Sequence, residues 1–111
     1  MKVAVVGSRN FNDIDLIVDT LGQYKIGEII SGGAAGADSL AEDFADAAGI
    51  KKTIFKANWE KYGRSAGYIR NIDIISNCDI CIAFWDGKSR GTKHSISLCK
   101  KHNKKCVIIK F

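Results

Sequence analysis

The sequence predicts an α/β protein built on a five-stranded parallel sheet, in the order 3-2-1-4-5, with about four helices. Three observations predict this fold. Short runs rich in valine and isoleucine alternate with segments whose apolar residues recur at helical spacing. The runs are nearly continuous in apolar residues, which is typical of strands buried on both faces of a parallel sheet. Right-handed crossovers then leave few strand orders, and the best of these is a Rossmann-like three-layer sandwich.

Five apolar runs are expected to form the strands. The first four are each followed by glycine or polar residues, which commonly bound buried strands. In chain order the runs are Lys2–Val6, Glu28–Ile30, Lys52–Ala57, Asp79–Trp85 and Lys105–Phe111. The first leads directly into Gly7, so that it ends sharply.

The four segments between these strands are expected to form helices, because their apolar residues lie three or four positions apart. In chain order they are Asp13–Tyr24, Asp38–Ala48, Arg64–Asn77 and Thr92–His102. The second is followed by Gly49, and glycine is common just past a helix C-terminus. In the third, Ile69, Ile72 and Ile75 are expected to face the core.

The composition indicates one globular domain, residues 1–111, whose core needs neither a metal nor disulfides. No apolar run approaches the ~20 residues of a membrane span, and the N-terminus lacks a signal-peptide pattern. A cytoplasmic protein without membrane contact is therefore expected. The net charge is +5, and much of the excess lies in Lys100, Lys101, Lys104 and Lys105, near a predicted helix C-terminus. A nucleic-acid patch is the alternative, although aromatic residues do not interleave with these lysines.

The four cysteines are Cys78, Cys81, Cys99 and Cys106. Cys78 and Cys81 have the spacing of a metal-binding pair, but a strand points residues three positions apart to opposite faces. The other two cysteines have no matching pair, and neither histidine completes a ligand set. We therefore expect buried free thiols and no metal site.

The residues that follow the first four strands are rich in glycine, hydroxyl and charged side chains. Because the carboxyl ends of parallel strands meet at one edge of the sheet, these loops are expected to form one ligand-binding crevice. Three of the loops open onto helix N-termini, whose free N–H groups and dipole favour an anion. The candidate binding residues are Gly7, Ser8, Arg9, Ser31, Gly32, Gly33, Gly36, Asp38, Trp59, Asp86, Gly87, Ser89, Arg90, Gly91 and Thr92.

Two short motifs in these loops are weak when each is taken alone. Ser31-x-Gly33-x-x-Gly36 is similar to the dinucleotide fingerprint G-x-G-x-x-G, but it follows the second strand and begins with serine. Gly87-Lys88-Ser89 matches the end of a P-loop, yet Ile82 stands where the first glycine of that motif is required. Neither motif assigns a function without the other loops.

The expected contacts to a bound phosphate come from four residues. Gly91 lets the backbone approach the phosphate closely, and Thr92 either caps the fourth helix or donates its hydroxyl to the anion. Arg9 and Arg90 are expected to add bidentate contacts. Trp59 lies beside these loops and is a candidate to stack on a base, although a role as a core aromatic residue remains open.

Four blocks of sequence, in this order, resemble one protein family. They are GSRNF, ISGGAAGADSLA, ANWEKYGRSAGYIRN and FWDGKSRGTKHSI. Together they are similar to the YspA-type proteins of the SLOG superfamily, over essentially the whole chain. The resemblance implies a Rossmann-like fold and a nucleotide-related ligand derived from NAD or ADP-ribose. It adds Arg70 and Asn71, in the third block, to the candidate site.

The same superfamily includes LOG-type phosphoribohydrolases, with the signature P-G-G-x-G-T-x-x-E. Gly91-Thr92 matches the G-T, and Arg70 matches the arginine on the preceding helix. Ser95 stands where the catalytic glutamate is expected, and a neutral hydroxyl does not stabilise the positive charge that develops on the ribose. Asp38 and Asp86 are the remaining carboxylate candidates, so the resemblance leaves catalytic activity open.

Three functions follow from these observations. The first is binding of an ADP-ribose-like, NAD-like or nucleoside phosphate ligand, for sensing or sequestration, with no other cofactor. The second is hydrolysis of a nucleotide N-glycosidic or phosphate bond. The third follows the DNA-processing members of the superfamily and is single-stranded DNA binding that weakens steeply with salt. A homo-oligomer, dimeric or larger, is expected by analogy, because a small domain can use a second subunit as one wall of its site.

Overall fold

Five strands form one parallel sheet, and the computed structural model describes residues 1–111. The strand order is β3-β2-β1-β4-β5, as the sequence predicts. The strands are β1 (Lys2–Gly7), β2 (Glu28–Ser31), β3 (Lys51–Ile54), β4 (Ile80–Trp85) and β5 (Lys105–Lys110). The predicted fold class, an α/β three-layer sandwich, is therefore confirmed.

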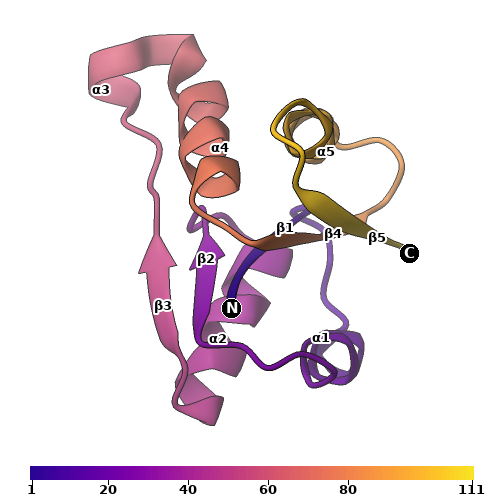
Figure 1. The fold of residues 1–111 in the computed structure, drawn as a ribbon. Helices are drawn as coiled ribbons and strands as arrows, with labels where there is room; N and C mark the ends of the chain where they lie inside the picture. The colour runs from indigo at the N-terminus through magenta and orange to yellow at the C-terminus, as the bar shows by residue number, and fades with distance from the viewer.

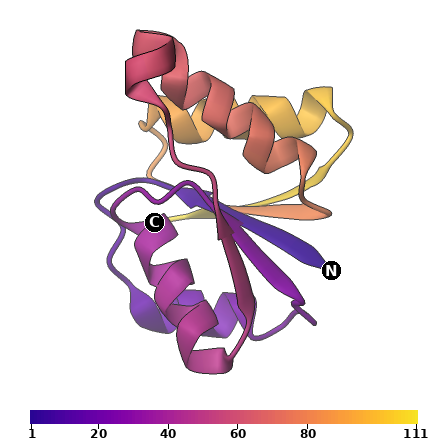
Figure 2. The same ribbon diagram turned by 90° about the vertical axis from the view of Figure 1, so that its left-hand side faces the viewer.

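Helices cover both faces of the sheet and form the outer layers of the sandwich that Figure 2 shows edge-on. They are α1 (Ile14–Leu21), α2 (Ala37–Ala48), α3 (Trp59–Tyr62), α4 (Ala66–Ser76) and α5 (Arg90–Lys101). The helices α1 and α2 pack on one face, whereas α4 and α5 pack side by side on the other (Figure 1). None of these helices combines the length and the apolar character that crossing a bilayer requires.

Alternate residues of β1 face opposite layers. Val3 and Val5 pack against α1 and α2, whereas Ala4 and Val6 pack against α4 and α5. Every residue of β4 except Trp85 is likewise buried. Because both faces of the central strands are covered, almost all of their side chains are apolar, which produces the continuous apolar runs in the sequence.

Three of the differences from the sequence predictions have a clear physical cause. The helix α5 begins at Arg90 because the Ser89 hydroxyl caps it, accepting the Thr92 N–H at 3.3 Å, so the alternative role of Thr92 as the cap was wrong. The strand β3 ends at Ile54, since its partner β2 ends at the paired residue Ser31. In α4, Ile72 is 42% exposed instead of facing the core. The buried face of this helix is formed by Asn71, Ile74 and Ile75, which lie three and four positions apart.

The carboxyl ends of β1 and β4 are the point at which the chain leaves the sheet in opposite directions. After β1 the chain continues to α1 on one face, and after β4 it continues to α5 on the other. The Ser8 N–H donates to the Phe84 carbonyl at 3.0 Å, which extends the pairing of the two strands to the edge. In open α/β sheets, a crevice at such a switch point is where ligands bind.

Gly36 packs the loop after β2 against the loop after β1. It has a φ of 82°, and a Cβ atom at this position would lie 2.7 Å from the Arg9 carbonyl oxygen. Gly49, just past α2, also has a positive φ of 68°, but a Cβ atom there would meet nothing within 4 Å. Gly36 therefore carries a cost of crowding that Gly49 does not, in addition to the cost of its positive φ.

We expect Gly36→Ala to lower the free energy of unfolding more than Gly49→Ala does. Both substitutions place a side chain at a positive φ, which costs about 1–2 kcal/mol. Only the alanine at position 36 overpacks a neighbouring backbone, which adds about 1–3 kcal/mol. Urea titration of the two variants measures the difference, and equal losses would contradict the close packing of the two loops.

Candidate functional site

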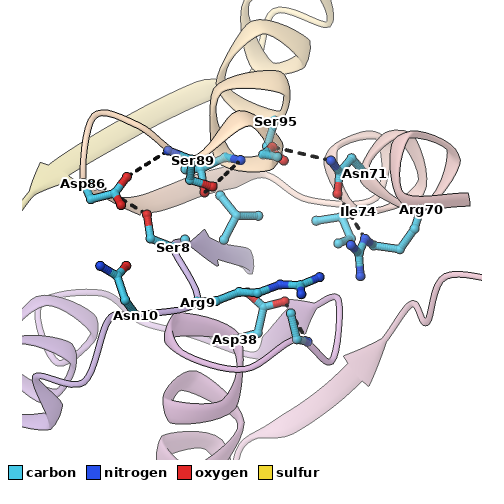
Figure 3. A pocket seen from close by; sticks show the side chains of 15 residues that line it. Ser8, Arg9, Asn10, Asp38, Arg70, Asn71, Ile74, Asp86, Ser89 and Ser95 are labelled. Atoms are coloured by element: carbon cyan, nitrogen blue, oxygen red, sulfur yellow. Dashed lines mark hydrogen bonds between the residues drawn. The ribbon is translucent and has the colours of Figure 1, made fainter. Parts of the chain in front are cut away.

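The carboxyl edge of the sheet contains a cavity of about 490 Å³ between the loops that follow β1, β2 and β4 and the helix α4 (Figure 3). This volume lies within the range of roughly 300–1,000 Å³ that is usual for small-molecule sites. Only three of its 15 lining residues, Val6, Ala34 and Ile74, are hydrophobic. The lining therefore favours a polar or charged ligand.

A second cavity of about 340 Å³ adjoins the first. Arg9, Ala34 and Arg70 line both cavities. The rest of the second cavity is formed by Gly32, Gly33, Lys56, Ala57 and Trp59. The Trp59 ring is 57% exposed, so one face of an aromatic platform is available to a ligand in this cavity. Together the two cavities form one extended surface with two arginines where they meet.

The Asp86-Gly87-Lys88-Ser89 segment is a turn held by its own first side chain. Asp86 Oδ1 accepts the Lys88 N–H at 2.8 Å and the Ser89 N–H at 2.9 Å. These two hydrogen bonds lower the pKa of Asp86, so its carboxylate is ionised at neutral pH. The Asp86 N–H in turn donates to Ser8 Oγ at 3.2 Å, which ties this turn to the loop after β1. Gly87 allows the turn with a φ of 82°.

The N-terminus of α5 forms another wall of the first cavity. The hydroxyls of Ser89 and Thr92 lie 3.0 Å apart, and the Thr92 N–H is satisfied by Ser89 Oγ. The N–H groups of Arg90 and Gly91 have no acceptor within the protein, and Gly91 lines the cavity. One turn further along, the Ser95 side chain, 2% exposed, also lines it. This helix end therefore offers free N–H groups and the positive end of its dipole to an anion.

Asp38 is the one deeply buried carboxylate of the cavity. Its Oδ2 accepts the Gly32 N–H at 2.9 Å and the Ala34 N–H at 3.4 Å. Its Oδ1 has no hydrogen-bond partner, and it is not sealed from solvent, because every fully buried polar side-chain atom has a partner. Since Asp38 lines the cavity, Oδ1 faces it. Burial raises the pKa of Asp38 from 3.8 to about 6, against the opposing effects of the two N–H groups and Arg70.

This arrangement changes the predicted role of the glycine-rich loop. The sequence predicts that this loop forms one side of an anion-binding crevice, but Asp38 accepts two of its N–H groups, those of Gly32 and Ala34. The Ser31 hydroxyl donates to Glu42 Oε2 at 2.6 Å and does not reach either cavity. The loop therefore contributes shape and a carboxylate to the site.

Arg70 joins α4 to the other loops. Its Nη1 donates to the Gly32 carbonyl at 2.8 Å, and its Nε donates to Asn71 Oδ1 at 3.0 Å. Asn71 Nδ2 lies 3.2 Å from His94 Nδ1 and 3.5 Å from the Gly91 carbonyl oxygen. Burial lowers the pKa of His94, so its ring is neutral at pH 7. This network fixes the orientation of Arg70 and Asn71 before any ligand binds.

Arg9 differs from Arg70 because its guanidinium makes no hydrogen bond or ion pair within the protein. It is exposed and borders both cavities. Figure 3 shows its side chain extending over Asp38 towards the wall that contains Arg70. Arg90 is exposed and unpaired as well, but it lines neither cavity. Arg9 is therefore a free cation shared by both cavities, and Lys56, which is also exposed and unpaired, borders the second cavity.

Most candidates from the sequence lie at the two cavities. The first brings together Gly7, Ser8, Arg9, Asp38, Arg70, Asn71, Asp86, Ser89, Gly91 and Thr92. Gly32, Gly33 and Trp59 line the second. Four candidates line neither cavity, and these are Ser31, Gly36, Gly87 and Arg90. Gly36 and Gly87 instead shape the backbone, and Arg90 is exposed at the start of α5.

The candidate residues predicted from the sequence did not include several lining residues, among them Asn10, Lys56 and Ile74. Asn10 follows Arg9 directly, and its place in the same loop was a usable signal. Lys56 lies just after β3, and Ile74 lies one helical turn after Arg70. Their contribution depends on how α4 and the segment after β3 pack at the sheet edge, which the sequence pattern does not show.

Comparison with known proteins gives one family and one curated relative. A family model described as the YspA, cpYpsA-related SLOG family matches residues 1–62. The Gene 61 protein of Mycobacterium phage D29 is 32% identical over 111 residues, covering 90% of this chain and 89% of that protein. The match to the family model includes the loop after β1 and the loop after β2.

Two solved structures are similar in fold. DNA processing protein A from Helicobacter pylori, studied for its single-stranded DNA binding mode, has a TM-score of 0.75 and 21% identity. That match covers 97% of this chain, which spans only 64% of the Helicobacter pylori chain. A predicted subunit of tRNA methyltransferase from Methanocaldococcus jannaschii has a TM-score of 0.52 and 18% identity, over 97% of this chain and 67% of that one.

The raised pKa of Asp38 predicts a specific pH dependence of stability. The pKa of Asp38 is about 6 in the folded state, above the ordinary value of 3.8 for an aspartate. The folded state therefore binds this proton more tightly than the unfolded state does. The contribution of Asp38 to the free energy of unfolding therefore falls by up to about 3 kcal/mol as the pH rises from about 4 to about 6. Asp38→Asn keeps an oxygen acceptor for the Gly32 N–H and removes this titration.

Urea titration of the wild type and Asp38→Asn from pH 4 to pH 7 measures this effect. As the pH rises, the free energy of unfolding of the wild type should fall relative to that of the variant. A difference that stays constant across this range would show that Asp38 titrates normally and is not buried as described.

Proposed function

The chain belongs to the YspA, cpYpsA-related SLOG family, and we propose that its adjoining cavities bind a nucleotide-derived ligand for sensing or sequestration. The chemical class is an ADP-ribose-like or NAD-like molecule or a nucleoside phosphate. The observation that carries the proposal is the position of Arg9 and Arg70, which line both cavities. A ligand with phosphate in its middle and uncharged groups at its ends matches this arrangement.

Each part of such a ligand has complementary groups in the site. Arg9 and Gly91 line the same cavity, and the Gly91 N–H at the start of α5 has no acceptor. Both groups are therefore suited to bind a phosphate in the first cavity. The Oδ1 atom of Asp38 faces the first cavity and is suited to accept a hydrogen bond from a ribose hydroxyl. Trp59 in the second cavity is suited to stack on a base.

Replacing Arg9 tests the placement of the phosphate. We expect Arg9→Ala to weaken ADP-ribose binding about 10- to 100-fold, because a hydrogen bond to a charged group contributes about 1.5–3 kcal/mol. Its guanidinium has no partner in the protein, so the variant should fold normally. Arg90→Ala is the matched control, since it removes an exposed arginine of the same end of the molecule that lines neither cavity.

Isothermal titration calorimetry of the wild type and both variants gives the comparison directly. Equal losses for Arg9→Ala and Arg90→Ala would indicate general electrostatic attraction. Loss for Arg90→Ala alone would place the phosphate at Arg90, outside both cavities. Either outcome contradicts the proposed site.

Hydrolysis of the bound ligand is the second candidate function. Ser95 lines the cavity but cannot replace the glutamate of the LOG-type signature, whereas Asp38 has a free oxygen and a pKa near neutrality. Native mass spectrometry after incubation with AMP, NAD, ADP-ribose or cyclic ADP-ribose distinguishes the two functions. An intact ligand retained on the protein supports binding. Release of a base or a shortened ligand that is lost in Asp38→Asn would assign hydrolysis.

The same spectra report the number of subunits, and we propose that the protein forms a homo-oligomer. Tyr68 and Ile72 on α4 are 54% and 42% exposed, and the same helix contributes Arg70 and Asn71 to the first cavity. A second subunit against this helix would cover apolar surface and deepen the cavities. A monomer with undiminished affinity would contradict this.

Single-stranded DNA is a further candidate because the Helicobacter pylori protein of similar fold binds it. The lysine cluster gives little support to DNA binding at the cavities. Lys100, Lys101 and Lys105 lie at the opposite edge of the sheet from the cavities. A strand bound at the site would compete with ADP-ribose and be lost with Arg9→Ala. Binding that ignores ADP-ribose and Arg9 would instead use the lysine-rich edge.

A further inference from the structure

Three cysteines meet in the core on the far side of the sheet from α1 and α2. Cys81 is in β4, Cys106 is its paired neighbour in β5, and Cys99 lies above them in α5. Their sulfur atoms all lie within 4.8 Å of one another, and none forms a disulfide. We call these residues the thiol cluster. It is separate from the two cavities, whose linings contain no cysteine.

The cluster arises from tertiary packing and not from a sequence motif. Cys81 and Cys106 face the same layer because β4 and β5 pair in register, and Cys99 reaches them from the helix that connects these two strands. The fourth cysteine, Cys78, is buried nearby, but its thiol donates to the Ile75 carbonyl at 3.3 Å and it is not part of the cluster. The Cys78–Cys81 spacing therefore does not describe this site.

The surroundings of the thiol cluster restrict what it can bind. Its neighbours in the core are apolar, among them Ala83, Leu98 and Ile96. No histidine, carboxylate or further cysteine completes the group of three sulfur atoms. Structural zinc sites almost always have four protein ligands, and hard ions require oxygen ligands. Three thiolates in an apolar shell instead match a soft ion of low coordination number, and Cu(I) is such an ion among those that thiolates select.

We propose that the thiol cluster binds one Cu(I) ion through the sulfur atoms of Cys81, Cys99 and Cys106. The ion replaces thiol protons, which pass to solvent, and its charge offsets part of the negative charge of the thiolates. Cys81 and Cys99 are 0% and 1% exposed, whereas Cys106 is partly exposed and offers the entry path. Lys104 provides a cation beside this core, since its ammonium donates to the Cys78 carbonyl at 2.7 Å.

The test is an anaerobic titration of the reduced full-length protein with Cu(I) in the presence of bathocuproine disulfonate, a coloured chelator that competes for the ion. We expect the wild type to retain one Cu(I) per chain, and X-ray absorption of that complex to show sulfur ligands only. Bound Cu(I) should also raise the unfolding temperature, because it binds the folded state.

Two matched cysteine variants show whether Cu(I) binds to the thiol cluster or to any buried thiol. Cys106→Ser removes its most accessible ligand and should weaken Cu(I) binding by more than the roughly 10- to 100-fold that follows loss of an outer-shell partner. Cys78→Ser removes a buried thiol outside the cluster and should keep the affinity of the wild type. Thermal unfolding of both variants establishes that each is folded.

Several results would overturn the proposal. These are complete transfer of the Cu(I) to the chelator, nitrogen or oxygen ligands in the absorption spectrum, or the same loss in Cys78→Ser as in Cys106→Ser. Because the spectrum is recorded on the wild type, failure of a variant to fold does not prevent the test. Arg9→Ala should retain Cu(I) in full, so the outcome is independent of the nucleotide proposal.

Discussion

Residues Val3 to Gly7 of β1 pair in parallel with Ile80 to Phe84 of β4, and the site depends on this pairing. The chain leaves the two strands towards opposite faces of the sheet, so the loops that follow them diverge and leave a space between their ends. The Ser8 N–H and the Asp86 N–H bridge the base of that space, to the Phe84 carbonyl and to Ser8 Oγ. Side chains from α2, α4 and α5 then close its sides.

Within this space, the protein satisfies many of its own polar groups. Asp38 accepts N–H groups of the glycine-rich loop, Asp86 accepts those of its own turn, and Arg70 donates to Gly32 and Asn71. The groups that remain unpaired include the Arg9 guanidinium, the Lys56 ammonium, the first N–H groups of α5 and Asp38 Oδ1. A rigid frame with a few free groups is the arrangement expected of a preorganised binding site, because little has to be reordered when the ligand arrives.

The sequence predicted the sheet order and the edge that carries the site, because alternation of buried strands with amphipathic helices leaves one simple topology. It did not distinguish Arg9 from Arg90, since that difference depends on which way the first turn of α5 points. It assigned Ser31 and the loop N–H groups to an anion, because the internal carboxylate of Asp38 was not counted as their acceptor. It also did not anticipate the thiol cluster, because strand register brings Cys81 to Cys106. The sequence shows which side chains each loop carries, but it does not show which groups tertiary packing brings into contact with them.

The central claim is that a nucleotide-derived ligand occupies the cavities at the carboxyl edge of the sheet. Amide chemical shifts of ¹⁵N-labelled protein, recorded by NMR during titration with ADP-ribose, test it most directly. The account predicts saturable shifts at residues 8–10, 32–34 and 86–92, in three of the loops that border the cavities. Shifts confined to residues 100–105 at the opposite edge, or no shifts at millimolar ligand, would contradict it.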